Sequence, residues 1–306
     1  MNLKPYIYSY SKNENNFYIQ RDDLIPYSFG GNKVRKNIYY FEEIISKNYT
    51  HVVTYGSSSS NHARIVANLA IQNNLKCTII TPLTEGDMTY NSTINNILQS
   101  KIVYTPLDKV KETIDGTLEE LKAIGEEPYF IQGGGHGFLG TKAYVDSFKY
   151  INDFSSQHHI KFDYIFLASG TGATQAGLII GNHLEKYESK IVGISIARNT
   201  SRGIEVIKSS MEEYFKTKYI DRNLEINFKD KYLCGGYGKF GNEISNCIDE
   251  YMQLYGIPLD PTYTGKAVYG MHEYLKEHEI TNRNILFIHT GGLPLYFDYL
   301  KEKSDA

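Results

Sequence analysis

The sequence predicts an α/β fold made of mostly parallel sheets covered by helices. The first observation is that strand-like and helix-like segments alternate over most of the chain, as they do in βαβ units. The second is size, because 306 residues with a hydrophobic fraction of 41% can bury a large core, as about two domains or one large unit. This alternation excludes an all-β protein and a helical bundle.

Runs of β-branched or aromatic residues, bounded by turn residues or charges, predict the strands. In order, they are His51–Tyr55, Lys76–Thr81, Lys101–Tyr104, Tyr129–Gln132, Asp163–Ser169, Lys190–Ala197 and Asn284–Thr290. Amphipathic stretches before and between them predict helices over Asn37–Ser46, His62–Asn74, Leu107–Ile124, Gly137–Asn152, Thr174–Tyr187 and Asn242–Leu254. The charged stretch 201–231 is expected to form a surface helix followed by a connection.

The domain organisation follows from the same alternation, because no Pro- or Ser-rich linker divides the chain. We expect residues 46–155 to form a smaller α/β domain. It would be inserted into a larger domain made of residues 1–45 and 156–306.

Charge and cysteine content narrow the class of protein. Lys and Arg number 32 against 35 Asp and Glu, which gives a net charge of −3, whereas nucleic acids and anionic membranes attract basic proteins. No apolar run reaches the roughly 18 residues of a membrane span, and the first residues lack a signal-peptide pattern. The 3 cysteines lack metal-ligand spacing. We therefore expect a cytoplasmic protein with no metal site, no nucleic-acid partner and no membrane anchor.

A glycine pair and a lysine come just before the first predicted helix. Gly30 and Gly31 permit a tight turn, and Lys33 follows where the helix begins. Partial burial would lower the pKa of Lys33 and expose a reactive lone pair, which makes it a candidate nucleophilic amine. Taken alone, the cluster of Lys33, Arg35 and Lys36 is better explained as a basic surface face.

A serine run follows the first predicted strand. Residues 57–60 are all serine, and Asn61 and His62 come next, at the start of a helix. Backbone N–H groups at a helix start, with hydroxyls beside them, form a natural carboxylate site. Simple N-capping is an equally weighted alternative, although one cap needs only one serine.

Glycine and threonine fill the turn after the strand that ends at Ser169. The turn contains Gly170, Thr171, Gly172, Ala173 and Thr174, whose N–H groups and hydroxyls suit a phosphate at the positive end of a helix. It lacks the lysine of a nucleotide P-loop. It also departs from the dinucleotide fingerprint, because Gln175 replaces the third glycine and the next strand ends at Arg198 instead of an acid. We expect a phosphate site of another kind, in preference to a merely structural turn.

The C-terminal region places Thr290, Gly291 and Gly292 at the end of the last predicted strand, after a segment that contains Tyr263. Open α/β sheets bind ligands at this end of their strands. The alternative is that Thr290 caps the final helix.

In combination, these blocks resemble the pyridoxal-phosphate enzymes of the tryptophan-synthase-β fold type, also called fold type II. The resemblance is strongest to the branch of D-cysteine desulfhydrase and 1-aminocyclopropane-1-carboxylate deaminase. The motifs stand in family order: residues 20–24, 30–33, 60–62, 170–172, 260–266 and 289–292. The resemblance implies a two-domain enzyme whose larger domain binds pyridoxal 5′-phosphate. It also implies a small amino-acid substrate and a homodimer.

The resemblance further implies the roles of the site residues. Lys33 would form the internal aldimine with the cofactor and take the substrate α-proton, with Tyr263 and Ser60 as further catalytic residues. The cofactor would be held by Asn61 at its ring hydroxyl, by residues 170–174 at its phosphate and by Thr290 at its pyridine nitrogen. The substrate would be bound by Ser59, Ser60, Asn61, His62 and Tyr263. This chemistry needs no metal.

Three positions help to choose a reaction within the branch. Deaminase members typically have Glu, Leu and Gln where this chain has Thr264, Thr290 and His62. We therefore expect a D-cysteine desulfhydrase-like lyase that performs α,β-elimination and forms pyruvate and ammonia. The alternatives are 1-aminocyclopropane-1-carboxylate deaminase and a β-replacement synthase. A nicotinamide oxidoreductase and a pyridoxal-phosphate-binding protein without turnover fit the motifs less well. Unusual loops at 133–137 and 236–241, and Ala173, favour a specialised amino acid.

Overall fold

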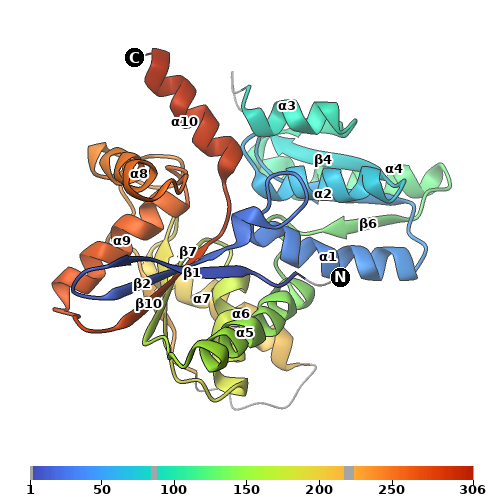
Figure 1. Cartoon of the computed structure of the whole chain (residues 1–306). Coiled ribbons are helices and arrows are strands. Elements are labelled where there is room, and N and C mark those ends of the chain that lie inside the picture. The colour runs from blue at the N-terminus through green and yellow to red at the C-terminus, as the bar shows by residue number, and fades with distance from the viewer. Residues whose placement is uncertain (1–2, 84–87, 217–223, 306) are drawn as a thin grey trace.

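The structure is a computed structural model, and it describes residues 3–83, 88–216 and 224–305. These residues form two sheets that lie in separate parts of the molecule (Figure 1). The larger sheet has six strands, in spatial order β1 (Tyr6–Lys12), β2 (Asn16–Arg21), β10 (Asn284–His289), β7 (Tyr164–Ser169), β8 (Lys190–Ser195) and β9 (Asn227–Lys229). The smaller sheet has four, in order β5 (Lys101–Thr105), β4 (Lys76–Pro82), β3 (His51–Tyr55) and β6 (Pro128–Ile131).

Helices cover both faces of the larger sheet. One face packs against α8 (Asn242–Tyr255), α9 (Thr264–Glu277) and α10 (Leu293–Asp305), and the other against α5 (Phe138–His158), α6 (Ala173–Leu184) and α7 (Thr200–Phe215). Strand β10 shows the cause, because Ile285 and Phe287 join the first cluster whereas Leu286 and Ile288 join the second. A strand buried on both faces has an almost continuous run of apolar residues, and such a run predicts β10 from the sequence.

The smaller sheet is covered in the same way. Helices α1 (Asn32–Ser46) and α2 (Asn61–Gln72) pack on one face, and α4 (Val110–Ala123) packs on the other. Helix α3 (Tyr90–Ile97) contacts α2 and the C-terminal helix α10. Because all neighbours in the smaller sheet are parallel, as are all pairs in the larger sheet except β1 with β2, the α/β prediction is confirmed.

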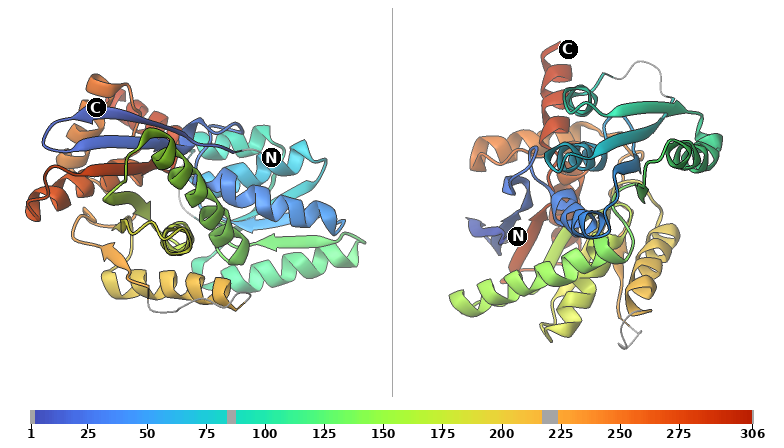
Figure 2. Two further views of the ribbon diagram at one scale, coloured as in Figure 1. Left: turned by 60° about the horizontal axis from the view of Figure 1, so that its bottom comes forward. Right: turned by 90° about the vertical axis from the view of Figure 1, so that its right-hand side faces the viewer.

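The structure adds elements that the sequence patterns did not indicate. Strands β1 and β2 form an antiparallel hairpin at one edge of the larger sheet (Figure 2). Strand β9 has only 3 residues, and α3 and α9 were not predicted, whereas α10 is the final helix expected after Thr290. The short 3₁₀ helices η1 (Asp22–Leu24) and η2 (Leu107–Lys109) complete the fold. Helix α7 forms within the stretch 201–231, but it buries Ile207, Met211 and Tyr214, and residues 217–223 lie outside the described part.

The domain limits at residues 46 and 155 stay a prediction. The core to which each neighbouring helix contributes indicates where the limits lie. Helix α1 contributes Val34, Phe41 and Ile44 to the core of the smaller sheet. Helix α5 contributes Tyr144 and Phe148 to the core of the larger sheet. We therefore propose that the smaller unit begins near the start of α1 and ends before α5.

Candidate active site

A cavity of ≈ 450 Å³ opens where strands of both sheets reach their carboxyl ends. Most of the predicted site residues line it, namely Lys33, Ser60, Asn61, His62, Gly170, Thr171, Gly172, Thr174, Tyr263 and Thr290. Two are not among its lining residues. Ala173 is fully buried at the start of α6, and the Ser59 hydroxyl lies 3.2 Å from that of Ser57.

Lys33 lies in the first turn of α1, directly after two glycines with positive φ. A Cβ atom on Gly31 would lie 2.8 Å from the carbonyl oxygen of Thr290, so glycine is needed where this turn meets the end of β10. The Lys33 Nζ donates a hydrogen bond to the Gly134 carbonyl oxygen at 3.1 Å. No Asp or Glu occurs among the described residues that line the cavity. Burial lowers the pKa of Lys33 to about 8, which favours the reactive neutral amine.

The start of α2 faces the cavity, and Ser60 is its N-cap. The Ser60 Oγ accepts a hydrogen bond from the backbone N–H of Ala63 at 3.2 Å. The capping explanation is therefore correct for this atom, although the hydroxyl can still donate its own hydrogen. The N–H groups of Asn61 and His62 have no intrahelical partner because they lie in the first turn. This helix start offers several donors to an anion.

Both ring nitrogens of His62 form hydrogen bonds within the protein. Thr54 Oγ1 donates to the Ile131 carbonyl oxygen at 2.8 Å, so it accepts from His62 Nε2 at 2.9 Å. The other ring nitrogen then accepts from Asn37 Nδ2 at 3.2 Å. Burial, together with nearby lysines, lowers the pKa of His62 well below its usual value, so the ring is neutral. The backbone N–H of His62, and not its ring, is the group available to a substrate carboxylate.

The glycine turn after β7 is shaped like an anion site. Gly172 has φ +90°, and a Cβ atom there would lie 3.0 Å from the backbone of Val206 and Ile207, so this position needs glycine. Asn32 Nδ2 donates to Thr174 Oγ1 at 3.1 Å and joins the turn to α1. Ser169 is among the lining residues, and its buried Oγ has no partner among the described residues. Free hydroxyls, a helix start and the absence of a lining carboxylate fit a phosphate group.

Tyr263 precedes α9 and reaches the cavity from the side of the larger sheet. Its Oη lies 2.7 Å from the Oη of Tyr237, and both residues line the cavity. Burial raises the pKa of Tyr263, so its phenol stays protonated at neutral pH. The pair can hold or pass one proton between its two hydroxyls.

Asp260 organises the turn that carries Tyr263. Its carboxylate accepts hydrogen bonds from the N–H groups of Thr262 at 2.9 Å and Tyr263 at 2.7 Å. The Thr264 Oγ1 donates to the same carboxylate at 2.8 Å. Neither Asp260 nor Thr264 is among the residues that line the cavity. The carboxylate therefore fixes the turn and does not face a ligand.

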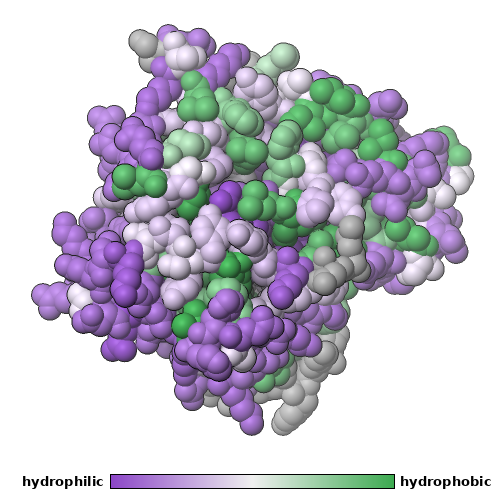
Figure 3. Space-filling view, in the orientation of Figure 1, coloured by the Kyte–Doolittle hydropathy of each residue, from purple (hydrophilic) through white to green (hydrophobic). Residues whose placement is uncertain are grey.

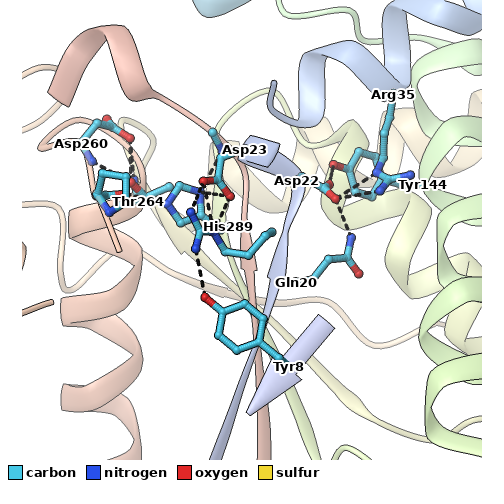
Figure 4. A network of polar contacts seen from close by, with 12 residues as sticks. Tyr8, Gln20, Asp22, Asp23, Arg35, Tyr144, Asp260, Thr264 and His289 are labelled. Atoms are coloured by element: carbon cyan, nitrogen blue, oxygen red, sulfur yellow. Dashed lines mark hydrogen bonds and ion pairs between the residues drawn. The ribbon is translucent and has the colours of Figure 1, made fainter. Parts of the chain in front are cut away.

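Two aspartates behind the cavity hold the lysine turn against the rest of the fold (Figure 4). Asp22 accepts hydrogen bonds from three side chains of different elements, those of Gln20, Arg35 and Tyr144. Its backbone oxygen accepts from the Gly31 N–H at 2.8 Å. Asp23 pairs with Arg21 at 2.7 Å and packs 3.3 Å from His289 Nδ1 at the end of β10. This network fixes Lys33 beside Thr290.

Three further residues line the cavity although sequence reasoning assigned them no role there, and a fourth, Lys36, is buried one turn beyond Lys33 without lining it. Tyr237, His136 and Arg198 line the cavity. Lys36, read as part of a basic surface face, is 1% exposed, and burial together with the charge of Lys33 lowers its pKa well below the usual range. The spacing of residues 33 and 36 could have indicated this, because residues three apart lie on the same face of a helix.

Known proteins share this architecture. A family model described as "Pyridoxal-phosphate dependent enzyme" matches residues 5–291. A relative from Pyrococcus abyssi, provisionally named a 1-aminocyclopropane-1-carboxylate deaminase, is 32% identical over 294 residues, which cover 93% of this chain and 87% of the relative. A D-cysteine desulfhydrase from Klebsiella pneumoniae is 29% identical over 290 residues, which cover 92% of this chain and 88% of that protein.

Solved structures are similar over the same length. The structure of a 1-aminocyclopropane-1-carboxylate deaminase homologue has a TM-score of 0.87 at 31% identity and covers 95% of this chain and 89% of that one. The structure of threonine deaminase isoform 2 from Solanum lycopersicum has a TM-score of 0.66 at 18% identity, over 91% of this chain and 80% of that one. The second likeness supports the fold alone.

Proposed function

The chain belongs to the family of pyridoxal-phosphate-dependent enzymes, and on that premise we propose that it catalyses α,β-elimination from a small amino acid, as a D-cysteine desulfhydrase does. The products would be pyruvate, ammonia and the β-substituent. Pyridoxal 5′-phosphate is the cofactor of this family. When bound, it supplies the electron sink that stabilises charge at the substrate Cα.

The residues of the cavity fit this cofactor. The turn 170–174, with the unpartnered hydroxyl of Ser169, would hold the phosphate, and the Lys33 amine would hold the carbonyl carbon. Asn61 and Thr290 line the same cavity and would contact the ring. Because burial favours the neutral amine, Lys33 Nζ is also suited to take the substrate α-proton.

The start of α2 would bind the substrate carboxylate. Ser60 contributes a hydroxyl, and Asn61 and His62 contribute backbone N–H groups. Ser59 lies in the adjoining loop, with its hydroxyl turned to Ser57, and would act through its backbone. Tyr263, paired with Tyr237, would exchange a proton with the leaving group.

The environment of Thr264 is the observation that favours elimination over ring opening. Opening a cyclopropane ring needs an added acid–base group near the reacting carbons. Here the Thr264 hydroxyl donates to Asp260, and the described lining residues include no carboxylate. Elimination of a good leaving group needs only the lysine base and the tyrosine pair.

Two other reactions remain candidates. The 1-aminocyclopropane-1-carboxylate deaminase activity is supported by the names of several relatives, one of which matches at 32% identity. A β-replacement synthase would use the same residues and then add a second nucleophile to the substrate carbon skeleton.

A substrate screen tests the proposal. Purified protein loaded with cofactor would be given D-cysteine, L-cysteine, β-chloroalanine, O-acetylserine and 1-aminocyclopropane-1-carboxylate, and the keto acid formed would be measured. We expect pyruvate from at least one β-substituted substrate. If 2-oxobutyrate from the cyclopropane substrate is the main product, the deaminase assignment replaces elimination. If a new amino acid forms only when a thiol or amine is added, the enzyme is a synthase.

Assembly and location are separate proposals. Among the helices that the structure describes, none is long and apolar enough to cross a membrane. A homodimer and a cytoplasmic location stay predictions. Light scattering of the purified protein, and fractionation of its native cells, would test them.

A further inference from the structure

The side chain of Asn61 is held from behind by two residues that do not reach the cavity. Arg64 Nη1 donates to Asn61 Oδ1 at 2.7 Å, and Asn91 Nδ2 donates to the same oxygen at 3.1 Å. Arg64 lies one turn further along α2, whereas Asn91 belongs to α3. Neither is among the cavity-lining residues.

The donors and acceptors of this cluster allow one arrangement. A guanidinium has only donors, so the atoms that face Arg64 must be the oxygens of Asn61 and Asn91. The Asn91 amide must then turn its nitrogen toward Asn61 Oδ1 and the Ser59 carbonyl oxygen, and the latter contact is 2.8 Å. Asn61 Oδ1 accepts two hydrogen bonds, from Arg64 and Asn91, so Nδ2 is the polar atom of Asn61 that faces the cavity. Asn61 is therefore a donor there and not an acceptor.

Arg64 is an unusual residue to find in this position. Its side chain is fully buried, and the described contacts of its guanidinium are to the neutral amides of Asn61 and Asn91. Its Nε and Nη2 atoms have no partner in the part of the chain that the structure describes. Burying an unpaired cation costs stability, and burial lowers the pKa of Arg64 to about 9. This loss of stability is explained if the guanidinium is needed to orient the Asn61 side chain.

Helix α3 carries Asn91, and it is held against the serine loop and the C-terminal helix. Its N-cap Thr89 donates from Oγ1 to the Ser58 carbonyl oxygen at 2.7 Å, so α3 holds the serine loop at two points. The Tyr90 N–H donates to Asp298 of α10 at 3.0 Å, which joins α3 to the C-terminal helix. Hydrophobic residues gather over α3 in Figure 3, and Tyr90 and Ile97 are exposed there.

We propose that Arg64 and Asn91 are positioning residues that fix the Asn61 amide with Nδ2 toward the cavity, where it donates to the ring oxygen of the bound cofactor. This inference rests on the proposed function, because Asn61 must meet the cofactor. A donor stabilises the ionised form of that oxygen, whereas an acceptor in its place would favour the protonated form. The visible absorbance of the bound cofactor reports which form is present.

Asn91→Asp is the decisive variant. It keeps an oxygen for Arg64 and strengthens that contact by charge, while it removes the donor to the Ser59 carbonyl oxygen. It also places a carboxylate oxygen, in place of a donor, against Asn61 Oδ1. This repulsion opposes the Arg64 contact, so the Asn61 amide is no longer fixed with its Nδ2 toward the cavity. Arg64→Met removes the cation at similar size, and Arg64→Lys restores a donor. Asn61→Ala is the reference, and Asn95→Ala, on the same helix, is the matched control.

Each variant would be freed of cofactor and titrated with pyridoxal 5′-phosphate, and the dissociation constant and absorbance spectrum would be recorded. We expect Asn61→Ala, Asn91→Asp and Arg64→Met to weaken cofactor binding about 10-fold, the effect of one charge-assisted hydrogen bond. Their absorbance should move from the visible band toward the near-ultraviolet. Arg64→Lys and Asn95→Ala should keep the visible band.

The outcomes separate this inference from the proposed function. If Asn61→Ala shifts the spectrum but Asn91→Asp leaves it unchanged, the positioning role is wrong and the function stands. If Asn61→Ala itself changes neither spectrum nor affinity, Asn61 does not meet the cofactor, and both the placement of the ring and this inference fail. Should Arg64→Met not fold, Asn91→Asp decides alone.

Discussion

Lys33 lies in the cavity with no ion-pair partner among the described residues, and burial alone lowers its pKa to about 8 from the ordinary 10.5. At pH 7 about a tenth of this amine is therefore neutral, whereas an exposed lysine is almost fully protonated. In the cofactor-free protein, we expect the rate of Lys33 modification by an amine reagent to rise with a midpoint near pH 8. A midpoint near 10.5 would show that Lys33 is not desolvated. The part of the modification that is absent in Lys33→Ala is the part that occurs at Lys33.

The same pKa shift makes the stability of the cofactor-free protein depend on pH. Between about pH 8 and pH 10.5, the unfolded chain binds a proton at residue 33 that the folded chain lacks. Lys33 therefore makes the free energy of unfolding rise with pH across this window. Below it, the buried ammonium destabilises the folded chain by an amount that no longer changes with pH. Urea denaturation of the native protein and Lys33→Ala at several pH values should show the difference in slope.

Replacing Lys33 also tests its covalent role. We expect Lys33→Ala to lose borohydride-stable attachment of the cofactor and to reduce turnover by at least about 10³-fold, as loss of a nucleophile does. Lys231→Ala removes an exposed ammonium paired with Glu277 and is the matched control, which should be labelled normally. Mass spectrometry that finds the label on another lysine of the native protein would refute the assignment.

At the scale of the element, the start of α2 combines a structural and a functional role in Ser60. Ser60→Ala removes the cap and one donor, so the free energy of unfolding should fall by about 1 kcal/mol, and the KM should rise about 5- to 100-fold. Ser60→Asp keeps a capping oxygen but places a negative charge beside the substrate carboxylate. It should therefore retain stability while raising the KM at least as much.

Thermal denaturation and steady-state kinetics on the two Ser60 variants separate these roles. If the Asp variant keeps the native KM, capping is the whole function of Ser60 and the carboxylate site lies elsewhere. If both variants lose stability equally, the Ser60 Oγ contact with the Ala63 N–H is not the cap that the structure indicates.

At the scale of the whole molecule, Asp22 joins the N-terminal hairpin to α1 and α5. Its carboxylate is fully buried and pairs with Arg35 at 2.9 Å. Asp22→Ala leaves that guanidinium buried and unpaired, so we expect the free energy of unfolding to fall by about 3–5 kcal/mol. Cofactor loading should fall with it, because the Gly31 turn loses its anchor.

Asp115→Ala is the matched control for this prediction, since Asp115 forms an exposed pair with Lys111. We expect that variant to change the free energy of unfolding by less than about 0.5 kcal/mol. Urea denaturation of both variants measures the contrast. Equal small effects would mean that the network in Figure 4 does not hold the molecule together.

The strands show what sequence patterns can predict at this scale. All the strands expected from apolar runs are present, and His51–Tyr55 has the predicted limits. The central strands β3, β4, β7, β8 and β10 are buried on both faces, so each leaves a continuous local signal. The edge strands β5 and β6 are partly exposed and were recognised by their β-branched and aromatic residues. The hairpin β1–β2 was not predicted, although β1 alternates tyrosine with isoleucine and serine, a pattern typical of an edge strand. Helix α3 was missed since its surface is rich in asparagine, serine and threonine.

The sequence by itself determined the α/β class, the buried strands, the glycine turns at strand ends and the family, because each of these has a local or ordered pattern. Only the tertiary structure decided the order of the strands and the use of the His62 ring by Thr54 and Asn37. It also decided the burial of Lys36 and the contact of Arg64 and Asn91 with Asn61. These depend on side chains far apart in the chain, whose partners are chosen by packing and by the need of buried polar groups for hydrogen bonds.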